Sequence, residues 1–302
     1  MRMSRGAPAV VKLRSALTAT PLARRHEREA GERAARPAKR REGSPERIKA
    51  RQPPPIPFAA FEARSYPDAA LALALDMQSA LAVGEYLAVD LFAKLAAALA
   101  LAGAPLDVVA AATRVPTDEI RHAELALRMA ETLAGRPITV DVPRDRHAHL
   151  GGALSQEELD IAMVEMPAIG ETLACALLGA ARERARDPVL RALFSALVRD
   201  EVHHARLGWY YLVWRAPQWS QAERQRVADR VGRFVYHVES MFSRGRDAPR
   251  GAGQAARALG VLDTKTQRAV IRRVMEDEIV PGLDGLGLGA SHAWRARPRT
   301  SG

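Results

Sequence analysis

Cysteine is almost absent from this chain. Its 302 residues include one, Cys175, which has no partner for an internal disulfide. A single cysteine also cannot form a Cys-x-x-Cys iron or zinc centre. The sequence therefore excludes a disulfide scaffold and favours a reducing compartment, so we expect a cytoplasmic protein.

Long uninterrupted apolar runs are absent as well. The Ala- and Leu-rich stretch over 69–102 is interrupted by four charged residues and contains no run of 18 apolar residues. Because a transmembrane helix needs about 20 such residues, we expect no membrane span. The N-terminus is rich in arginine but lacks the short apolar core of a secretory signal.

The net charge of +10 comes entirely from the first 56 residues. They hold 15 Lys or Arg against 5 Asp or Glu, whereas residues 57–302 hold 30 of each. This segment is rich in Arg, Ala and Pro and has no hydrophobic period, so we expect a disordered basic tail over 1–56. The tail is either a solvated extension or a non-specific tether to nucleic acid or an anionic surface. The neutral body does not favour nucleic-acid binding.

The body is expected to be all α-helical, because its apolar residues recur with a helical period and no strand pattern competes. A shorter helix is expected over 107–114, before Pro116. The proline either separates it from the next helix or joins the two as one kinked helix. Pro167 is expected to bend the third main helix. The four main helices are predicted over 68–102, 117–135, 155–186 and 187–215, and two further C-terminal helices over 220–244 and 264–286.

Two short sequence motifs each occur twice, in the same order. Residues 84–88 and 170–174 read Gly-Glu-Tyr-Leu-Ala and Gly-Glu-Thr-Leu-Ala, and residues 118–123 and 200–205 read Asp-Glu-Ile-Arg-His-Ala and Asp-Glu-Val-His-His-Ala. Helical residues three apart share a face, so each Glu-x-x-His presents a carboxylate and an imidazole in one direction. The doubled pattern indicates a metal site. Its candidate ligands are Glu85, Glu119, His122, Glu171, Glu201 and His204.

The spacing allows these side chains to converge. Glu85 and Glu119 each lie about 25 Å from the turn between their helices at 1.5 Å per residue, so an antiparallel hairpin brings them level. The second pair repeats this spacing. Residues 136–154 form an irregular connection long enough to run the length of a bundle, as in crossover four-helix bundles. We also expect Gly84 and Gly170 to let neighbouring helices approach closely.

Charge points to the same kind of site. Four carboxylates among leucine and alanine are costly to bury unless they bind a cation, and two divalent ions balance four carboxylates. Oxygen and imidazole ligands suit iron or manganese, and they also bind zinc.

On these motifs, residues 68–215 resemble the ferritin-like di-iron carboxylate superfamily, in which one helix donates a Glu and the next a Glu-x-x-His, twice over. The resemblance implies a ferritin-like four-helix bundle over 57–215 that holds two metal ions, iron before manganese. Residues 216–302 would then form a helical extension packed on that bundle. The roles it implies are bridging carboxylates for Glu119 and Glu201, one-metal ligands for His122 and His204, and terminal ligands for Glu85 and Glu171.

The phrase Asp-Glu-Ile-Arg-His is similar to a form found in oxygen-activating members of that superfamily, where the aspartate orients an imidazole from the other motif. Arg121 would belong to this outer layer too. The second copy departs from the form, since His203 stands where arginine is expected. The implied pairs are Asp118 with His204, and Asp200 with His122.

The resemblance implies an oxygen-dependent oxidoreductase acting on a small organic substrate, with O₂ as co-substrate and an unidentified electron donor. A ferroxidase or iron-storage protein is the alternative. The C-terminal helices and the long tail make this less similar to a compact ferritin subunit. A tRNA hydroxylase is a third hypothesis, disfavoured by the neutral body. Homo-oligomers are compatible with each.

Overall fold

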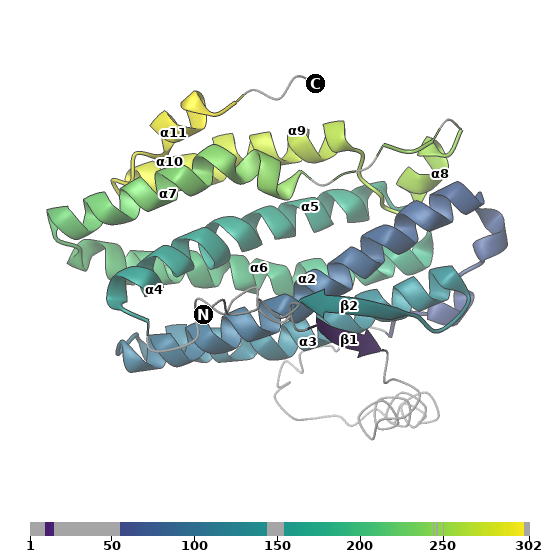
Figure 1. The fold of residues 1–302 in the computed structure, drawn as a ribbon, viewed down its shortest axis with the longest axis horizontal. Coiled ribbons are helices and arrows are strands. Elements are labelled where there is room, and N and C mark those ends of the chain that lie inside the picture. The colour runs from purple at the N-terminus through teal and green to yellow at the C-terminus, as the bar shows by residue number, and fades with distance from the viewer. Residues whose placement is uncertain are drawn as a thin grey trace, which may run out of the picture.

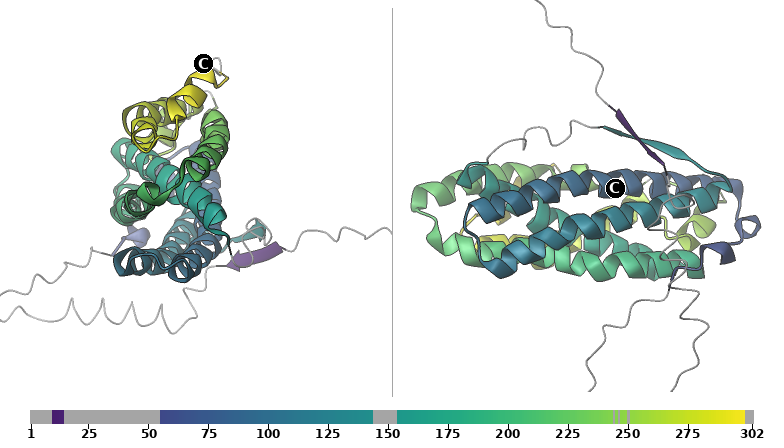
Figure 2. Two further views of the ribbon diagram at one scale, coloured as in Figure 1. Left: turned by 90° about the vertical axis from the view of Figure 1, so that its left-hand side faces the viewer. Right: turned by 90° about the horizontal axis from the view of Figure 1, so that it is seen from below.

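The computed structural model describes residues 10–14, 55–143, 154–243, 245, 247–249 and 251–298. Within these residues the fold is α-helical apart from one two-stranded ladder. Long helices pack side by side in pairs and form three layers, with α2 and α3 in the first, α5 and α6 in the second, and the C-terminal helices in the third (Figures 1 and 2).

The first layer is an antiparallel hairpin of α2 (Asp68–Leu101) and α3 (Leu106–Ala134). Gly103 makes the turn between them with a φ of 68°, a left-handed conformation that favours glycine. Pro116 lies inside α3, which continues through it as one helix. The separate piece expected over 107–114 is therefore part of α3.

The second layer is formed by the next two predicted helices. Ser155 and Glu158 form the expected capping box, and the side chain of Asp187 caps the next helix as expected. The bend expected at Pro167 takes the form of a π-helical segment, because proline removes one backbone donor from the helix. The elements are α4 (Gln156–Met163), η4 (Val164–Gly170), α5 (Glu171–Arg184) and α6 (Pro188–Arg215).

The connection between the layers contains a strand that the sequence interpretation missed. Strand β2 (Thr139–Pro143) pairs antiparallel with β1 (Val10–Arg14), with Lys12 opposite Asp141. Val142 is buried while its neighbours on either side are exposed, which is the period of two that marks a strand. The rest of the predicted tail up to residue 54, and residues 144–153 of the crossover, lie outside the described residues.

The third layer covers the second. The helix expected over 220–244 is α7, but the helix expected over 264–286 is divided by a second π-helical segment. Short 3-10 turns, η1 (Phe58–Ala60) and η2 (Ala63–Ser65), precede α2. The elements after the bundle are η5 (Ala216–Gln218), α7 (Gln221–Phe242), α8 (Gly253–Ala258), α9 (Thr264–Val274), η6 (Met275–Ile279), α10 (Val280–Gly285) and α11 (Ala290–Ala296).

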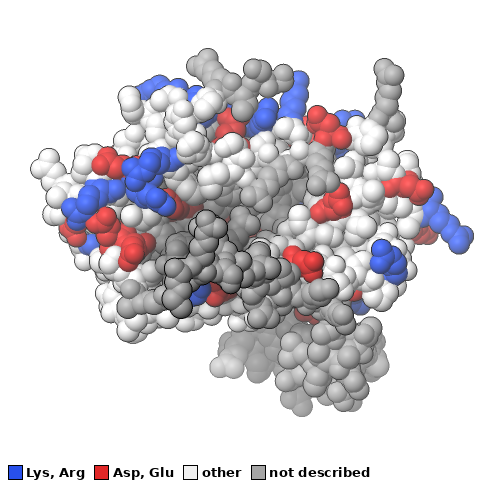
Figure 3. All heavy atoms as spheres, viewed as in Figure 1, with Lys and Arg blue, Asp and Glu red and all other residues white. Residues whose placement is uncertain are grey.

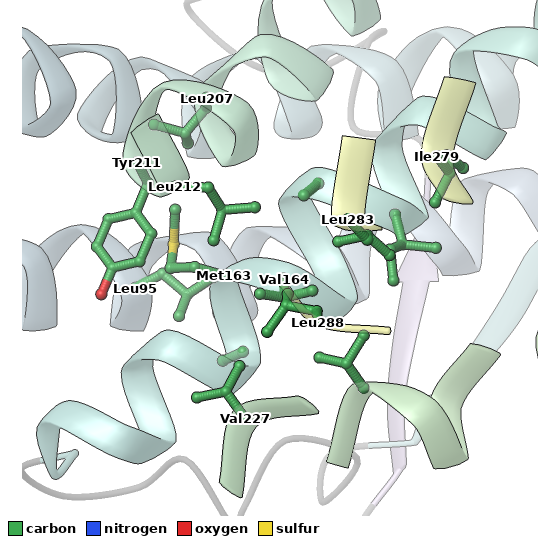
Figure 4. Close-up of a cluster of buried hydrophobic side chains, with 14 of the residues drawn as sticks. Leu95, Met163, Val164, Leu207, Tyr211, Leu212, Val227, Ile279, Leu283 and Leu288 are labelled. Carbon is green, nitrogen blue, oxygen red and sulfur yellow. The ribbon is translucent and has the colours of Figure 1, made fainter. Parts of the chain in front are cut away.

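The largest hydrophobic cluster joins the three layers. Leu95 of α2, Met163 of α4 and Tyr211 of α6 lie in the same buried cluster as Val227 of α7 and Leu283 of α10 (Figure 4). The C-terminal helices therefore share their apolar contacts with the bundle, and removing them would expose the second layer to water.

The charged side chains of the body are interspersed at its surface (Figure 3). Arg226 Nε lies 2.5 Å from a Glu157 oxygen, and Arg230 Nε lies 3.2 Å from a Glu165 oxygen. These pairs tie α7 to the helices beneath it and agree with the balanced composition of the body.

Among the described residues, one stretch is long and apolar enough to cross a membrane by length and composition. It spans Gln156–Arg184, with a mean hydropathy of 1.6 in its best window, of which 44% is buried inside the molecule. These are the helices α4 and α5 with η4 between them. Core helices commonly have this composition, so the stretch is weak evidence for a membrane span.

Candidate metal centre

The two Glu-x-x-His motifs meet at the centre of the bundle. Glu119 and His122 lie on α3, and Glu201 and His204 lie on α6. Each offers one ligand atom, and the four atoms lie within 4.8 Å of one another. No side chain of the four is more than 1% exposed. The cluster is therefore compact and shielded from water.

Both imidazoles turn the same ring nitrogen toward the carboxylates. His122 Nδ1 lies 3.0 Å from an oxygen of Glu201 and 3.5 Å from one of Glu119. His204 Nδ1 lies 3.1 Å from an oxygen of Glu119 and 3.4 Å from one of Glu201. The lone pairs of four different side chains are thus directed at one region of the interior.

The outward ring nitrogens face aspartates from the opposite motif. His122 Nε2 lies 3.1 Å from Asp200 Oδ2, and His204 Nε2 lies 3.5 Å from Asp118 Oδ2. These are the two cross pairs implied by the resemblance. A carboxylate at Nε2 favours the tautomer that is protonated there, which leaves Nδ1 free to bind a cation.

Arg121 distinguishes the two motifs. Its guanidinium pairs with Asp200, so one aspartate is held by both an arginine and an imidazole. The corresponding residue of the second motif, His203, is exposed on the outside of α6. A hydrogen bond with the imidazole of His204 holds the pKa of Asp118 below its ordinary value, and the charge of Arg121 lowers it further.

Glu85 and Glu171 approach the same cluster from α2 and α5. Burial raises the pKa of Glu85 well above its ordinary value, and repulsion from Glu119 and Glu201 raises it further. The pKa of Glu171 is raised by burial and then by the same two carboxylates. Glu85 and Glu171 therefore lie close enough to Glu119 and Glu201 to affect their charge, but the four-residue cluster does not include them, and their role as ligands stays a prediction.

Local backbone features place the two upstream glutamates differently. Glu171 is the first residue after the π-helical segment η4, whereas Glu85 lies within an unbroken α-helix. Where η4 meets α6, Gly208 is required, because a Cβ there would lie 2.2 Å from the backbone nitrogen of Ala168. The close approach expected at Gly84 is wrong, since no described atom of a neighbouring helix lies within 4 Å of a Cβ built there.

The donor set fits a cation. Among the described residues, none gives an acceptable hydrogen bond to either carboxylate oxygen of Glu119 or Glu201, or to Nδ1 of His122 or His204. Such buried atoms are costly unless something pairs with them. The protein alone compensates by protonation: against the effect of burial, Asp118, Glu119 and Glu201 raise the pKa of His204 to about 12. Divalent cations with a preference for oxygen and imidazole match these atoms.

A second buried polar cluster was missed at the sequence level. Asp160 of α4 is 1% exposed and accepts hydrogen bonds from Arg215 Nε at 3.1 Å and Trp219 Nε1 at 2.7 Å. The hydroxyl of Tyr211 also donates to it. The sequence signal that could have indicated this cluster was an aspartate between two apolar residues of α4, Leu159 and Ile161. This cluster is fully paired and joins α4 to α6 and to the turn before α7.

No protein-family model matches this sequence, and no curated protein matches it. The assignment therefore rests on the chain itself. It is an all-helical protein with a buried cluster of two Glu-x-x-His halves, consistent with a ferritin-like site.

Proposed function

We propose that this chain is a ferritin-like, di-iron, oxygen-dependent oxidoreductase that acts on a small organic substrate. The observation that supports it is the set of buried carboxylate and imidazole atoms that face one another without hydrogen bonds. The bundle would hold about two metal ions per chain, as carboxylate-histidine bundles of this class do. Glu119 and Glu201 would bridge the ions, and Glu85 and Glu171 would each complete one of them.

The chemistry of the pair follows from its ligands. Two Fe(II) ions held by these residues would supply electrons and open coordination positions for O₂ chemistry. The chain's own residues provide the rest: Asp118 and Asp200 keep the imidazoles oriented, and the carboxylates balance the charge. Phe92, which is buried and whose ring centroid lies 6.2 Å from that of His204, helps to exclude water.

The outer contacts support a metal site at this cluster. Each imidazole has an aspartate behind it, and one of these aspartates is also paired with an arginine. Such outer contacts raise ligand basicity and tune the metal. The third layer of helices covers the second and leaves the centre in apolar surroundings.

Metal analysis of the full chain tests the proposal. Protein purified without oxygen and loaded with Fe(II) should contain about two irons per chain by elemental analysis. Mixing with O₂ should consume oxygen and produce a near-ultraviolet absorption band. Glu119→Gln should abolish both, and Glu124→Gln, a partly buried residue of the same helix outside the cluster, should leave both intact.

Two results would overturn this proposal. Protein that holds only tightly bound zinc and shows no oxygen uptake after iron loading would exclude the oxidoreductase. A cage of many subunits by size-exclusion chromatography, with continued oxidation of added Fe(II) into mineral, would replace it by the ferroxidase.

A further inference from the structure

A fully buried amide on α2 is not used by the metal cluster. Gln78 is 0% exposed, and neither its Nε2 nor its Oε1 has a hydrogen-bond partner among the described residues. Leaving an amide unpaired in an apolar interior costs on the order of several kcal/mol. Both its donor and its acceptor are therefore available to a ligand.

Gln78 lies on the same stripe of α2 as the cluster. It precedes Glu85 by seven residues, which is two helical turns or about 10 Å along the axis and nearly the same angular position. Its neighbours on the buried face are small, since Ala74 and Ala82 are both 0% exposed. Ala82 packs with Ala126 of α3 in one buried cluster. One turn to either side of Gln78 this stripe of α2 thus carries methyl groups, while the larger Leu81 beside them is only partly buried.

At the corresponding sequence position, the second half of the repeat has no amide. Seven residues before Glu171 stands Val164, which is also 0% exposed, although the π-helical segment η4 gives it a different angular position from that of Gln78. An aliphatic side chain is sufficient to fill the interior there. The amide of Gln78 is therefore a polar feature particular to one side of the centre.

We propose that Gln78 anchors the organic substrate of the di-metal centre, and that this substrate carries a neutral group with a donor and an acceptor side by side, such as a carboxamide or a lactam. Such a group pairs with the Gln78 amide through two hydrogen bonds. A carboxylate of the same shape offers no donor and brings a negative charge toward Glu85 and its neighbours, which is unfavourable in an apolar interior. The substrate's apolar part then extends over the two turns toward the centre. This inference rests on the proposed function only for the claim that the other end of the ligand reacts at the metal centre.

Binding of pentanamide to the full-length, metal-loaded protein tests the assignment. Pentanamide carries a neutral carboxamide on a short apolar chain, and pentanoate is its charged counterpart. By isothermal titration calorimetry, the wild type should bind pentanamide at least tenfold more tightly than pentanoate. Gln78→Met removes both polar atoms at similar length and should weaken pentanamide binding about tenfold, since two hydrogen bonds are lost.

Matched variants separate anchoring from loss of structure. Gln225→Met changes an exposed glutamine of α7 whose Nε2 bonds Asp229 at 2.8 Å, and it should bind pentanamide like the wild type. Gln78→Asn keeps the amide but withdraws it by one methylene, so it should also bind pentanamide more weakly while its helical circular dichroism and metal content stay unchanged. These two variants keep the test decisive if Gln78→Met does not fold.

The outcomes distinguish this inference from the proposed function. Metal-loaded protein that ignores pentanamide, or a Gln78→Met variant that binds it like the wild type, would show that Gln78 holds at most a water molecule and would overturn the anchor alone. Protein that binds pentanamide through Gln78 but takes up no metal would overturn the proposed function and leave the anchor standing.

Discussion

The two halves of the repeat present the same residues to the centre and differ in almost everything behind them. Each half supplies a glutamate and a Glu-x-x-His motif, and each imidazole faces an aspartate from the other half. Only the first half has an arginine on that outer layer, Arg121. Only the second has a π-helical segment before its upstream glutamate, and there Gly208 stands where the first half has Ala126.

This difference separates two kinds of constraint. Residues that face the cluster are fixed by ligand chemistry, which is the same on both sides. Residues behind them are fixed by packing, which differs because α7 and α9 cover the second half while the crossover strand β2 lies against the first. Symmetry of the motif therefore does not extend to symmetry of the surroundings.

Removing a central carboxylate from either half should have the largest effect. Glu119→Gln and Glu201→Gln should each reduce bound metal from about two per chain to nearly none, because each carboxylate faces both imidazoles. Elemental analysis after iron loading measures this. If one variant kept both metals while the other lost them, the halves would not be equivalent at the centre.

Gly208→Ala should be the most destabilising change outside the cluster. The added methyl would meet the backbone of Ala168, so α6 and η4 must separate, at a cost of about 3 kcal/mol. The reverse exchange in the first half, Ala126→Gly, removes one methyl from a helix and should cost about 1 kcal/mol. Urea midpoints of the metal-free proteins compare the two, and equal costs would contradict the close contact.

The sequence was sufficient to predict the helices that carry the cluster. The helical period of the apolar residues indicates where helices lie, and capping residues indicate where they begin. The structure has the predicted caps at Ser155 and Asp187. The meeting of the two Glu-x-x-His motifs was also predictable from chain geometry, because equal distances from two turns bring these residues level in antiparallel hairpins.

What the sequence did not reveal depends on contacts between distant segments. Asp160 is stabilised by hydrogen bonds from Arg215 and Trp219, which are distant in the sequence and come close to it only in the folded chain. Strand β2 forms by pairing with β1, more than a hundred residues earlier in the chain. The two π-helical segments follow from packing of η4 and η6 against neighbouring helices, for which Pro167 was a sign in the first case only.

Exchanging Arg121 and His203, the residues at the third position of each Glu-x-x-His motif, should lower metal affinity moderately in the first half and leave it unchanged in the second. Arg121→His gives the first motif the residue of the second and leaves Asp200 without its guanidinium, so metal affinity should fall about tenfold. His203→Arg changes an exposed side chain and should leave the affinity unchanged. Competition with a chromophoric chelator measures both affinities, and an unchanged affinity in Arg121→His would contradict a role for Arg121 in holding Asp200.

The stabilisation produced by metal should grow as pH rises. In the metal-free protein the carboxylates raise the pKa of His204 to about 12 and that of His122 above its ordinary value of 6.5, against the effect of burial. The imidazole of His204 then holds a proton that the unfolded chain releases above pH 6.5, and His122 releases its proton at a higher pH than in the unfolded chain. Metal-free stability therefore falls with rising pH, by about 1.4 kcal/mol per pH unit for the His204 proton. Metal displaces these protons. The Tm gap between loaded and metal-free protein should widen from pH 6.5 to 8.5, and a constant gap would mean neutral imidazoles.

Replacing the glycines before Glu85 and Glu171 by alanine should give the smallest difference in stability between the halves. Gly84 lies in the middle of α2 with open space around a built Cβ, so Gly84→Ala should stabilise the protein by about 0.5–1 kcal/mol through helix propensity alone. At Gly170 a Cβ would lie 3.4 Å from the Glu165 carbonyl oxygen and 3.8 Å from Phe242, so Gly170→Ala should gain less or nothing. Thermal unfolding of the metal-free variants compares them. An equal gain in both would mean that the π-helical segment before Glu171 tolerates an added methyl as readily as the regular helix before Glu85.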